Sequence, residues 1–485
     1  MREGTWKRNV FVYSWAMAHT NASEPLTLIT EIPQIVARLR ATFDSGRTKP
    51  LSWRRAQLRA LRRLLTEERA TLEKALRSDL GKPPVEAHTT EIGFVVNEID
   101  HTLRHLASWL RPQRVSVPMA LAPAKARRVR EPLGAVLIIS PWNYPVNLAL
   151  SPLVGAIAAG NSAVVKPSEL SPATSAALAD LIPRYLDSQA VAVVEGGVAE
   201  STALLEQRFD HIFYTGNSAV ARIVMAAAVR HLTPLTLELG GKSPAVVEPG
   251  VDLATTARRL AWGKFTNAGQ TCVAPDYVLA VGDTADRLQR ELAAAITEMF
   301  GSDPAQSADY GRIVNERHFD RLSALLESGK VVAGGRTDRG DLYIAPTVLA
   351  DVDPDSPVMA EEIFGPILPV VRVPDLDAAI RFVNERDKPL ALYGFTDSET
   401  TKRRLTTETS SGGLGFGLPI AHLAVPELPF GGVGESGMGA YHSAASIDTF
   451  SHTKAVLDKS LLMDTMRVAY APISQVKERI LRRLL

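Results

Sequence analysis

The sequence of 485 residues contains a single cysteine, Cys272. One cysteine cannot form a disulfide within the chain, and it excludes zinc and iron–sulfur sites that are built from several thiolates. We therefore expect no metal site, and a reducing, cytoplasmic compartment. The role that a lone cysteine can still fill is that of a nucleophile.

The chain also lacks net charge and long apolar runs. Lys and Arg number 54 and Asp and Glu 53, a net charge of +1, which supplies no field to attract nucleic acid or an anionic membrane. No apolar run approaches the roughly 18 residues of a membrane-spanning helix. The run from Val10 to Ala18 only weakly resembles a signal peptide, and we interpret residues 1–29 as an N-terminal extension.

Short apolar runs alternate with helix-length stretches between Leu133 and Leu239. Apolar strands separated by helices indicate a parallel sheet that is covered on both faces. We expect a doubly wound, Rossmann-type α/β fold, with ligands at the carboxyl ends of the strands. The predicted strands are Ala135–Ile139, Ala163–Val165, Ala190–Val194, His211–Tyr214 and Leu235–Leu237.

Beyond Gly241 the alternation resumes, with strands expected at Ala245–Val247 and Tyr277–Val281, which predicts a second α/β domain. The Pro- and Ala-rich segment Val115–Val129 has no helical period and is interpreted as a protruding hairpin. We divide the rest of the chain into a dinucleotide-binding domain (30–111 and 132–240), a catalytic domain (241–446) and a small β bridging or oligomerisation element with the C-terminal tail (112–131 and 447–485).

A phosphate site is predicted at Tyr214–Ser218, which follows a strand and opens a helix expected over Ala219–Val229. Backbone N–H groups at a helix start face an anion, and Gly216 lets the ligand approach closely. An ordinary turn is the alternative. Gly432–Gly437 matches the dinucleotide fingerprint GxGxxG, but prolines interrupt the chain before it and no strand leads into it, so we do not assign it.

A ribose site is predicted at Lys166 and Glu169, in the sequence KPSE at another strand end. A lysine can donate to ribose oxygens and a carboxylate can accept from two hydroxyls. The alternative is a capped helix start, with Ser168 or Ser171 as the cap.

Two residues are candidates for the chemistry itself. Cys272 has small and polar neighbours in AGQTC, which indicates a loop where a thiolate can be reached, although a buried structural cysteine is the more common case. Glu238 interrupts the apolar stretch LEL at a strand end. A carboxyl group among leucines has a raised pKa, which suits a general base. The alternative is a buried ion pair, for instance with Lys242.

Taken together, these segments resemble the aldehyde dehydrogenase family. The resemblance is carried by Cys272 in GQTCVAPD, Glu238 in LELGGKSP, Asn143 in SPWNYPVNL and EEIFGPILP at Glu361–Pro369. KPSE, FYTGN and PFGGVGESGMGAYH add to it, so that it spans roughly Ser52–Ser451. The variants of these motifs look most like the class 3 branch, which includes fatty, aromatic and coniferyl-type aldehyde dehydrogenases.

The resemblance implies NAD-dependent oxidation of a hydrophobic aldehyde, aliphatic or aromatic, to its acid. Cys272 would form a thiohemiacetal and then a thioester, Asn143 would stabilise the oxyanion, and Glu238 would activate the hydrolytic water. Glu169 favours NAD, although class 3 members can also accept NADP. The implied cofactor-binding residues are Trp142, Lys166, Glu169, Thr215, Gly216, Asn217, Ser218, Ala219, Val220, Ala221, Leu239, Glu362 and Phe364.

The resemblance also implies a homodimer, bridged by Val115–Val129 and a strand near Ser451–Asp458. We expect no membrane contact, since the basic amphipathic helix at Ser474–Leu485 is short. A cysteine-dependent thioester or ester hydrolase without nicotinamide remains the alternative function.

Three departures from the family pattern stand out. Asn217 and Ala221 replace a common Ser and Gly, so that a methyl group is expected near the phosphate-binding helix. Gly415–Pro419 replaces a segment with an Asn that faces the site, which leaves the substrate class open.

Overall fold

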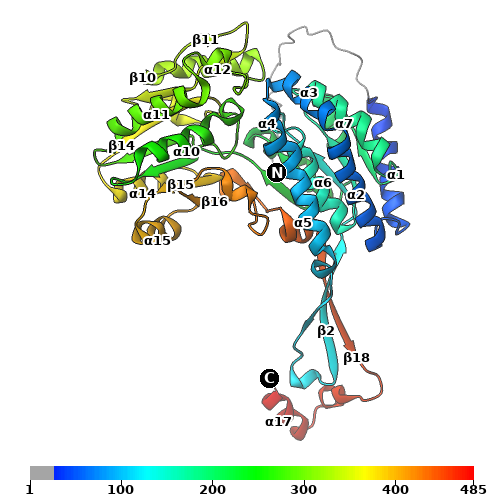
Figure 1. The fold of residues 1–485 in the computed structure, drawn as a ribbon. Coiled ribbons are helices and arrows are strands. Elements are labelled where there is room, and N and C mark those ends of the chain that lie inside the picture. The colour runs from blue at the N-terminus through cyan, green and yellow to red at the C-terminus, as the bar shows by residue number, and fades with distance from the viewer. Residues whose placement is uncertain (1–26, 485) are drawn as a thin grey trace, which may run out of the picture.

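The computed structural model of the chain describes residues 27–484. Most of the predicted extension at residues 1–29 therefore lies outside the described residues. Two α/β halves stand side by side, and a narrow β-sheet projects from them (Figure 1).

The first half is built on a six-stranded sheet in which five neighbouring strands are parallel, and a short antiparallel strand closes one edge. All five predicted strands are confirmed to within one residue at each end. Their order across the sheet is β17 (Gly437–Met438), β7 (Leu235–Glu238), β6 (His211–Thr215), β3 (Ala135–Ile139), β4 (Ser162–Lys166) and β5 (Val191–Val193).

Helices cover both faces of this sheet, as alternation along β3 shows. Ala135 and Leu137 belong to one buried cluster with residues of α1, α8 and α9. Val136 and Ile138 belong to another, with residues of α2, α5 and α6. Successive strand residues point to opposite faces, so both faces are buried and the strands read as continuous apolar runs. The helices of this half are α1 (Ile32–Asp44), α2 (Leu51–Glu67), α3 (Arg69–Leu80), α4 (Pro84–Ala87), α5 (Gly93–Trp109), α6 (Asn147–Ala159), α7 (Pro172–Tyr185), α8 (Val198–Leu205) and α9 (Ser218–Ala228).

The second half contains a seven-stranded sheet, parallel except at β10. Its strands, in order, are β10 (Lys330–Ala333), β13 (Thr347–Ala350), β14 (Ile367–Val373), β9 (Tyr277–Val281), β8 (Pro244–Val247), β15 (Ala391–Phe395) and β16 (Gly413–Phe416); β11 (Thr337–Asp338) and β12 (Tyr343–Ile344) form a separate pair. Its helices are α10 (Leu253–Phe265), α11 (Thr284–Phe300), α12 (Glu316–Leu325), α13 (Pro357–Ala360), α14 (Leu376–Asn384) and α15 (Glu399–Glu408).

The projecting sheet joins the predicted hairpin to a strand from the end of the chain. It consists of β1 (Gln113–Val115), β2 (Ala124–Pro132) and β18 (Ser451–Lys459), all antiparallel. The helix α16 (Ser443–Thr449) leads into β18, and α17 (Gln475–Leu484) lies at the far tip (Figure 1). Within residues 27–484, no helix combines the length and the apolar character needed to cross a membrane.

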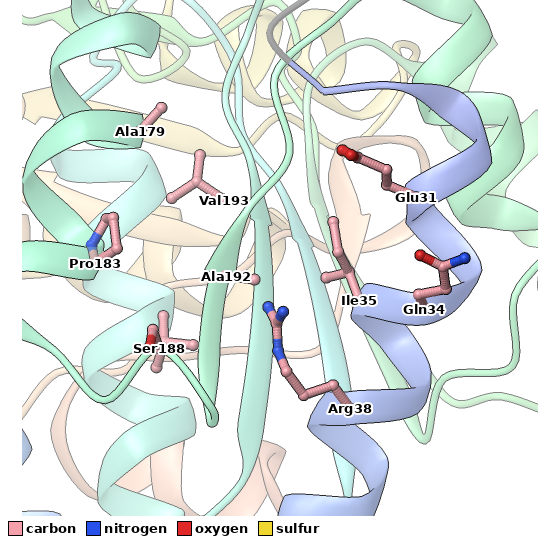
Figure 2. Close-up of a pocket in the computed structure, with 10 residues that line it drawn as sticks. Glu31, Gln34, Ile35, Arg38, Ala179, Pro183, Ser188, Ala192 and Val193 are labelled. Atoms are coloured by element: carbon pink, nitrogen blue, oxygen red, sulfur yellow. The ribbon is translucent and has the colours of Figure 1, made fainter.

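The two edges of the six-stranded sheet differ. At β17, the GxGxxG segment Gly432–Gly437 ends in an edge strand, and Leu239 N–H donates to Ser436 O at 3.1 Å. At the opposite edge, β5 borders a pocket of about 380 Å³ between α1 and α7 (Figure 2). None of the predicted site residues lines this pocket.

Candidate active site

Cys272 lies just beyond α10, in a loop that two buried amide side chains hold in place. Asn267 Nδ2 donates to Asn143 O at 2.8 Å, and Gln270 Nε2 donates to Arg312 O at 3.0 Å. Asn267 and Ala268 both adopt left-handed backbone conformations, with φ of 53° and 51°. Such conformations persist only where the surroundings enforce them, and they are common at functional sites.

The Cys272 thiol is partly buried and has two carboxyl groups near it. Burial raises its pKa, and Glu362 and Glu238 raise it further when they are ionised. The thiol is therefore protonated in the structure as it stands, and its proton must leave before the sulfur can attack a substrate.

Glu238 ends strand β7, with 1% of its surface exposed. Neither carboxyl oxygen has a hydrogen-bond partner among the described residues, and burial raises the pKa of the group well above its usual value. The alternative ion pair with Lys242 is wrong, because Lys242 Nζ instead contacts Asp276 Oδ2 at 2.6 Å. An uncommitted carboxyl group with a raised pKa is suited to take a proton from water.

Asn143 follows the carboxyl end of β3 and is almost completely buried. Its Nδ2 donates to Gln270 O at 3.0 Å, so the amide points at the loop that carries Cys272. Next to it, Tyr144 Oη and Thr271 Oγ1 are 2.6 Å apart. An amide nitrogen has two hydrogens, which leaves one for a second acceptor.

The start of α9 meets the requirements of a phosphate site. Thr215 Oγ1 is buried and has no partner among the described residues. A Cβ on Gly216 would lie 2.2 Å from Tyr214 Oη, so only glycine fits there. Asn217 accounts for one departure from the family pattern, since its side chain caps α9 by accepting from Val220 N–H at 2.9 Å. Ser218, which is half-buried, and Ala219, which is exposed, complete the first turn.

The methyl group of Ala221, which the sequence led us to expect near the phosphate-binding helix, belongs to α9 but faces the sheet and not the phosphate site. Its side chain is 1% exposed and packs into the apolar cluster with Val224 on the sheet side of α9.

Lys166 and Glu169 lie at the carboxyl end of β4, two strands from Thr215. Lys166 Nζ is 2.8 Å from Glu169 Oε2, and the carboxylate is half exposed. The helix start of the alternative interpretation is present, but the serine capping bond is not. Ser171 occupies the cap position of α7 without a side-chain bond, and Asp79 instead accepts from Thr174 N–H at 2.8 Å.

Glu362 and Phe364 come from the other half of the molecule and reach across to the first. Burial, and then the charge of Asp276, raises the pKa of Glu362 to about 8. A Cβ on Gly240 would lie 2.0 Å from Glu362 Oε2, so Glu362 lies against the turn that follows Glu238 and Leu239. The Phe364 ring stands edge-on to Trp142, with centroids 5.4 Å apart.

The structure thus brings the predicted residues of both halves together at the carboxyl ends of the strands of the six-stranded sheet. A helix start lined by glycine, an orphaned buried hydroxyl and a lysine–carboxylate pair fit the phosphate and ribose groups of a dinucleotide. The sequence reasoning missed Asn267 and Gln270; their place within five residues of Cys272 was the only available signal.

The model of the aldehyde dehydrogenase family matches residues 14–456. The chain belongs to the aldehyde dehydrogenase family. It is 49% identical over 449 residues to the rat protein named "Aldehyde dehydrogenase, dimeric NADP-preferring", covering 93% of this chain and 99% of that protein. It is 50% identical over 445 residues to human aldehyde dehydrogenase family 3 member B1, covering 92% of this chain and 95% of the relative.

Solved structures of aldehyde dehydrogenases share the fold. The substrate-bound state of Staphylococcus aureus AldH has a TM-score of 0.91 at 43% identity, covering 93% of this chain and 99% of that one. Mycobacterium tuberculosis aldehyde dehydrogenase complexed with NAD+ has a TM-score of 0.80 at 29% identity, covering 89% of this chain and 91% of that one. The predicted α/β fold and family are confirmed, and the chain is an NAD(P)-dependent aldehyde dehydrogenase.

Proposed function

We propose that this aldehyde dehydrogenase oxidises a hydrophobic aldehyde to its acid through Cys272, Asn143 and Glu238. One observation supports the proposal most strongly. The Asn143 amide is hydrogen-bonded to the loop that carries Cys272, and the buried Glu238 carboxyl raises the pKa of the Cys272 thiol and has no hydrogen-bond partner among the described residues.

In the first step, the Cys272 thiol gives its proton to solvent water, and its Sγ forms a bond to the aldehyde carbon. The carbonyl π electrons move to oxygen, where the second Asn143 N–H and the Cys272 backbone N–H stabilise the negative charge. The product of this step is a thiohemiacetal on Cys272.

When bound, the oxidised nicotinamide supplies an acceptor for the hydride that leaves the thiohemiacetal carbon. Lys166 and Glu169 would hold the adenosine ribose, and Thr215–Val220 the pyrophosphate. Glu362 would hold the nicotinamide ribose, and the nicotinamide ring would lie near Phe364. Trp142 and Leu239 are assigned to the walls of the same site.

In the last step, the ionised form of Glu238 accepts a proton from water, and the water oxygen attacks the thioester carbon. The bond from carbon to Cys272 Sγ breaks, the thiolate is released and the carboxylic acid leaves. Because Glu238 has no competing hydrogen bond among the described residues, a water molecule can occupy its acceptor sites.

We infer that NAD is used and that NADP is accepted as well. Glu169 would repel a 2′-phosphate, but Lys166 partly neutralises it at 2.8 Å. The rat relative is named NADP-preferring, which supports acceptance of both cofactors.

We further propose a homodimer in the cytoplasm without membrane contact. The projecting sheet is the element proposed to bridge the two copies, and the same rat relative is named dimeric. The cytoplasmic location rests on the single cysteine.

Steady-state kinetics over aldehydes of graded chain length and aromaticity, with NAD and with NADP, test this proposal. Reduced nicotinamide should form most efficiently with hydrophobic aldehydes, and Cys272→Ser should lower the rate at least about a thousand-fold. Formation of no reduced nicotinamide with any aldehyde, together with cofactor-independent ester cleavage, would favour the hydrolase alternative.

A further inference from the structure

A completely buried ion pair lies beside the segment that carries Asn143. Lys82 follows α3, and Glu91 lies in the helical turn that precedes α5. Lys82 Nζ is 2.6 Å from Glu91 Oε1, and neither side chain is exposed to solvent. Neither residue belongs to the motifs that carry the resemblance to the family.

The other contacts of this pair go to residues 143–147. Lys82 Nζ donates to Asn143 O at 3.1 Å and lies 4.1 Å from the centre of the Tyr144 ring. Glu91 Oε2 accepts from Val146 N–H at 3.0 Å and from Asn147 N–H at 2.9 Å. One ion pair therefore binds the backbone on both sides of a single turn, from Asn143 to the start of α6.

We propose that Lys82 and Glu91 are positioning residues, which hold the Asn143 amide in the orientation that stabilises the oxyanion. The proposal rests on the function proposed above for Asn143. Asn143 O accepts from Lys82 on one side and from Asn267 on the Cys272 loop on the other. The backbone at Asn143 is thus fixed between two donors, and from this fixed position the side-chain amide makes its own bond to Gln270 O.

Stability alone does not account for such a pair. Removing two charges from water carries a large desolvation cost, and apolar side chains of similar size often stabilise a fold equally well. Lys82 and Glu91 also make hydrogen bonds to one carbonyl and two N–H groups of the turn at residues 143–147, which apolar side chains cannot do. A displacement of the donor by about 1 Å can cost two orders of magnitude in rate.

A double-mutant cycle tests the proposal on the intact enzyme. The variant Lys82→Met/Glu91→Gln removes both charges of the pair together, and it is made in the wild type and in Asn143→Ala. The measurement is the rate constant of the first turnover of reduced nicotinamide, with cofactor and aldehyde saturating. Asn143→Ala alone should lower it about 100- to 1,000-fold.

If the pair acts through the Asn143 amide, the double substitution should lower the rate about 10- to 100-fold in the wild type. In Asn143→Ala the same substitution should lower it less than about twofold. Equal losses in both backgrounds would overturn the proposal. A full rate in Asn143→Ala would instead overturn the role of Asn143 itself, so the two failures are distinguishable.

The matched control is a second ion pair of the same half. Arg40 Nη1 and Asp210 Oδ2 are 3.0 Å apart, and Asp210 lies at the amino end of β6, away from the site. Arg40→Met/Asp210→Asn should leave the first-turnover rate within about twofold of the wild type.

Two further measurements separate positioning from damage to the fold. The Lys82/Glu91 variant should bind NAD with an unchanged dissociation constant, because Lys166 and Thr215 are not among its contacts. Loss of cofactor binding in parallel with the rate would overturn the proposal. Should this double variant fail to fold, Lys82→Gln/Glu91→Gln, which likewise leaves neither member of the pair as a lone charge, enters the same cycle with the same expected outcome.

Discussion

The buried polar groups on the two sides of Cys272 differ in how many hydrogen bonds they make. On one side, Asn143 is bonded through both its side chain and its carbonyl oxygen, to the Cys272 loop and to Lys82. On the other, the two oxygens of Glu238 have no hydrogen-bond partner among the described residues. A donor that stabilises a developing charge must already be in place, whereas a base must keep its acceptor sites for water. The difference in bonding matches the difference in the proposed roles.

The largest effect should come from removing the base. Glu238→Gln should lower steady-state turnover about 100- to 10,000-fold and leave the first turnover of reduced nicotinamide nearly intact, because thioester hydrolysis alone needs the base. Rapid-mixing kinetics would show a burst followed by a stall. Loss of the burst itself, as expected for Asn143→Ala, would show that the two sides do not differ in role.

The next effect concerns stability on the bonded side. Lys82→Met leaves the Glu91 carboxylate buried without its partner, and it should destabilise the protein by about 3–5 kcal/mol. Urea denaturation followed by circular dichroism measures this loss. A loss below about 1 kcal/mol, the value typical of an exposed ion pair, would mean that the pair is not buried in solution.

On the Glu238 side, removing the ionisable group should raise the stability of the protein instead of lowering it. The folded protein holds a proton on Glu238 that the unfolded chain releases above a pKa of about 4.5. Wild-type stability therefore falls as the pH rises from 4.5 towards the raised pKa of the folded state. Glu238→Gln removes this loss, so the variant should be more stable by about 1–3 kcal/mol at pH 8 and by much less at pH 4. Thermal unfolding of both proteins at the two pH values checks this, and a gain that does not depend on pH would contradict it.

The smallest effect should come from a carboxylate that is both paired and half exposed. Glu169→Gln should shift the ratio of kcat/KM for NADP over NAD upwards by about two- to fivefold, because a solvated charge contributes little. Steady-state kinetics with both cofactors measure the ratio. A shift towards NAD would show that Glu169 does not face the 2′ position.

The strands of the six-stranded sheet could be predicted from sequence because burial on both faces leaves a continuous apolar run. The break at Glu68 between α2 and α3 could not be predicted, because no proline or glycine marks it. Contacts between distant segments were also out of reach. Lys242 turned out to pair with Asp276, and Lys82 gave no sign of approaching Asn143, because both contacts depend on tertiary packing. The division into domains at residues 30–111, 132–240, 241–446 and 447–485 stays a prediction.

The short strand β17 has a consequence for the order in which the enzyme becomes active during synthesis. It pairs Gly437 and Met438 with Glu238 and Leu237, so the strand of the base has its outer neighbour only when residue 438 is available. About two hundred residues separate these partners, and a ribosome adds roughly 5–20 residues per second. A nascent chain therefore carries the nucleophile and the base for many seconds before the strand of the base gains its outer neighbour.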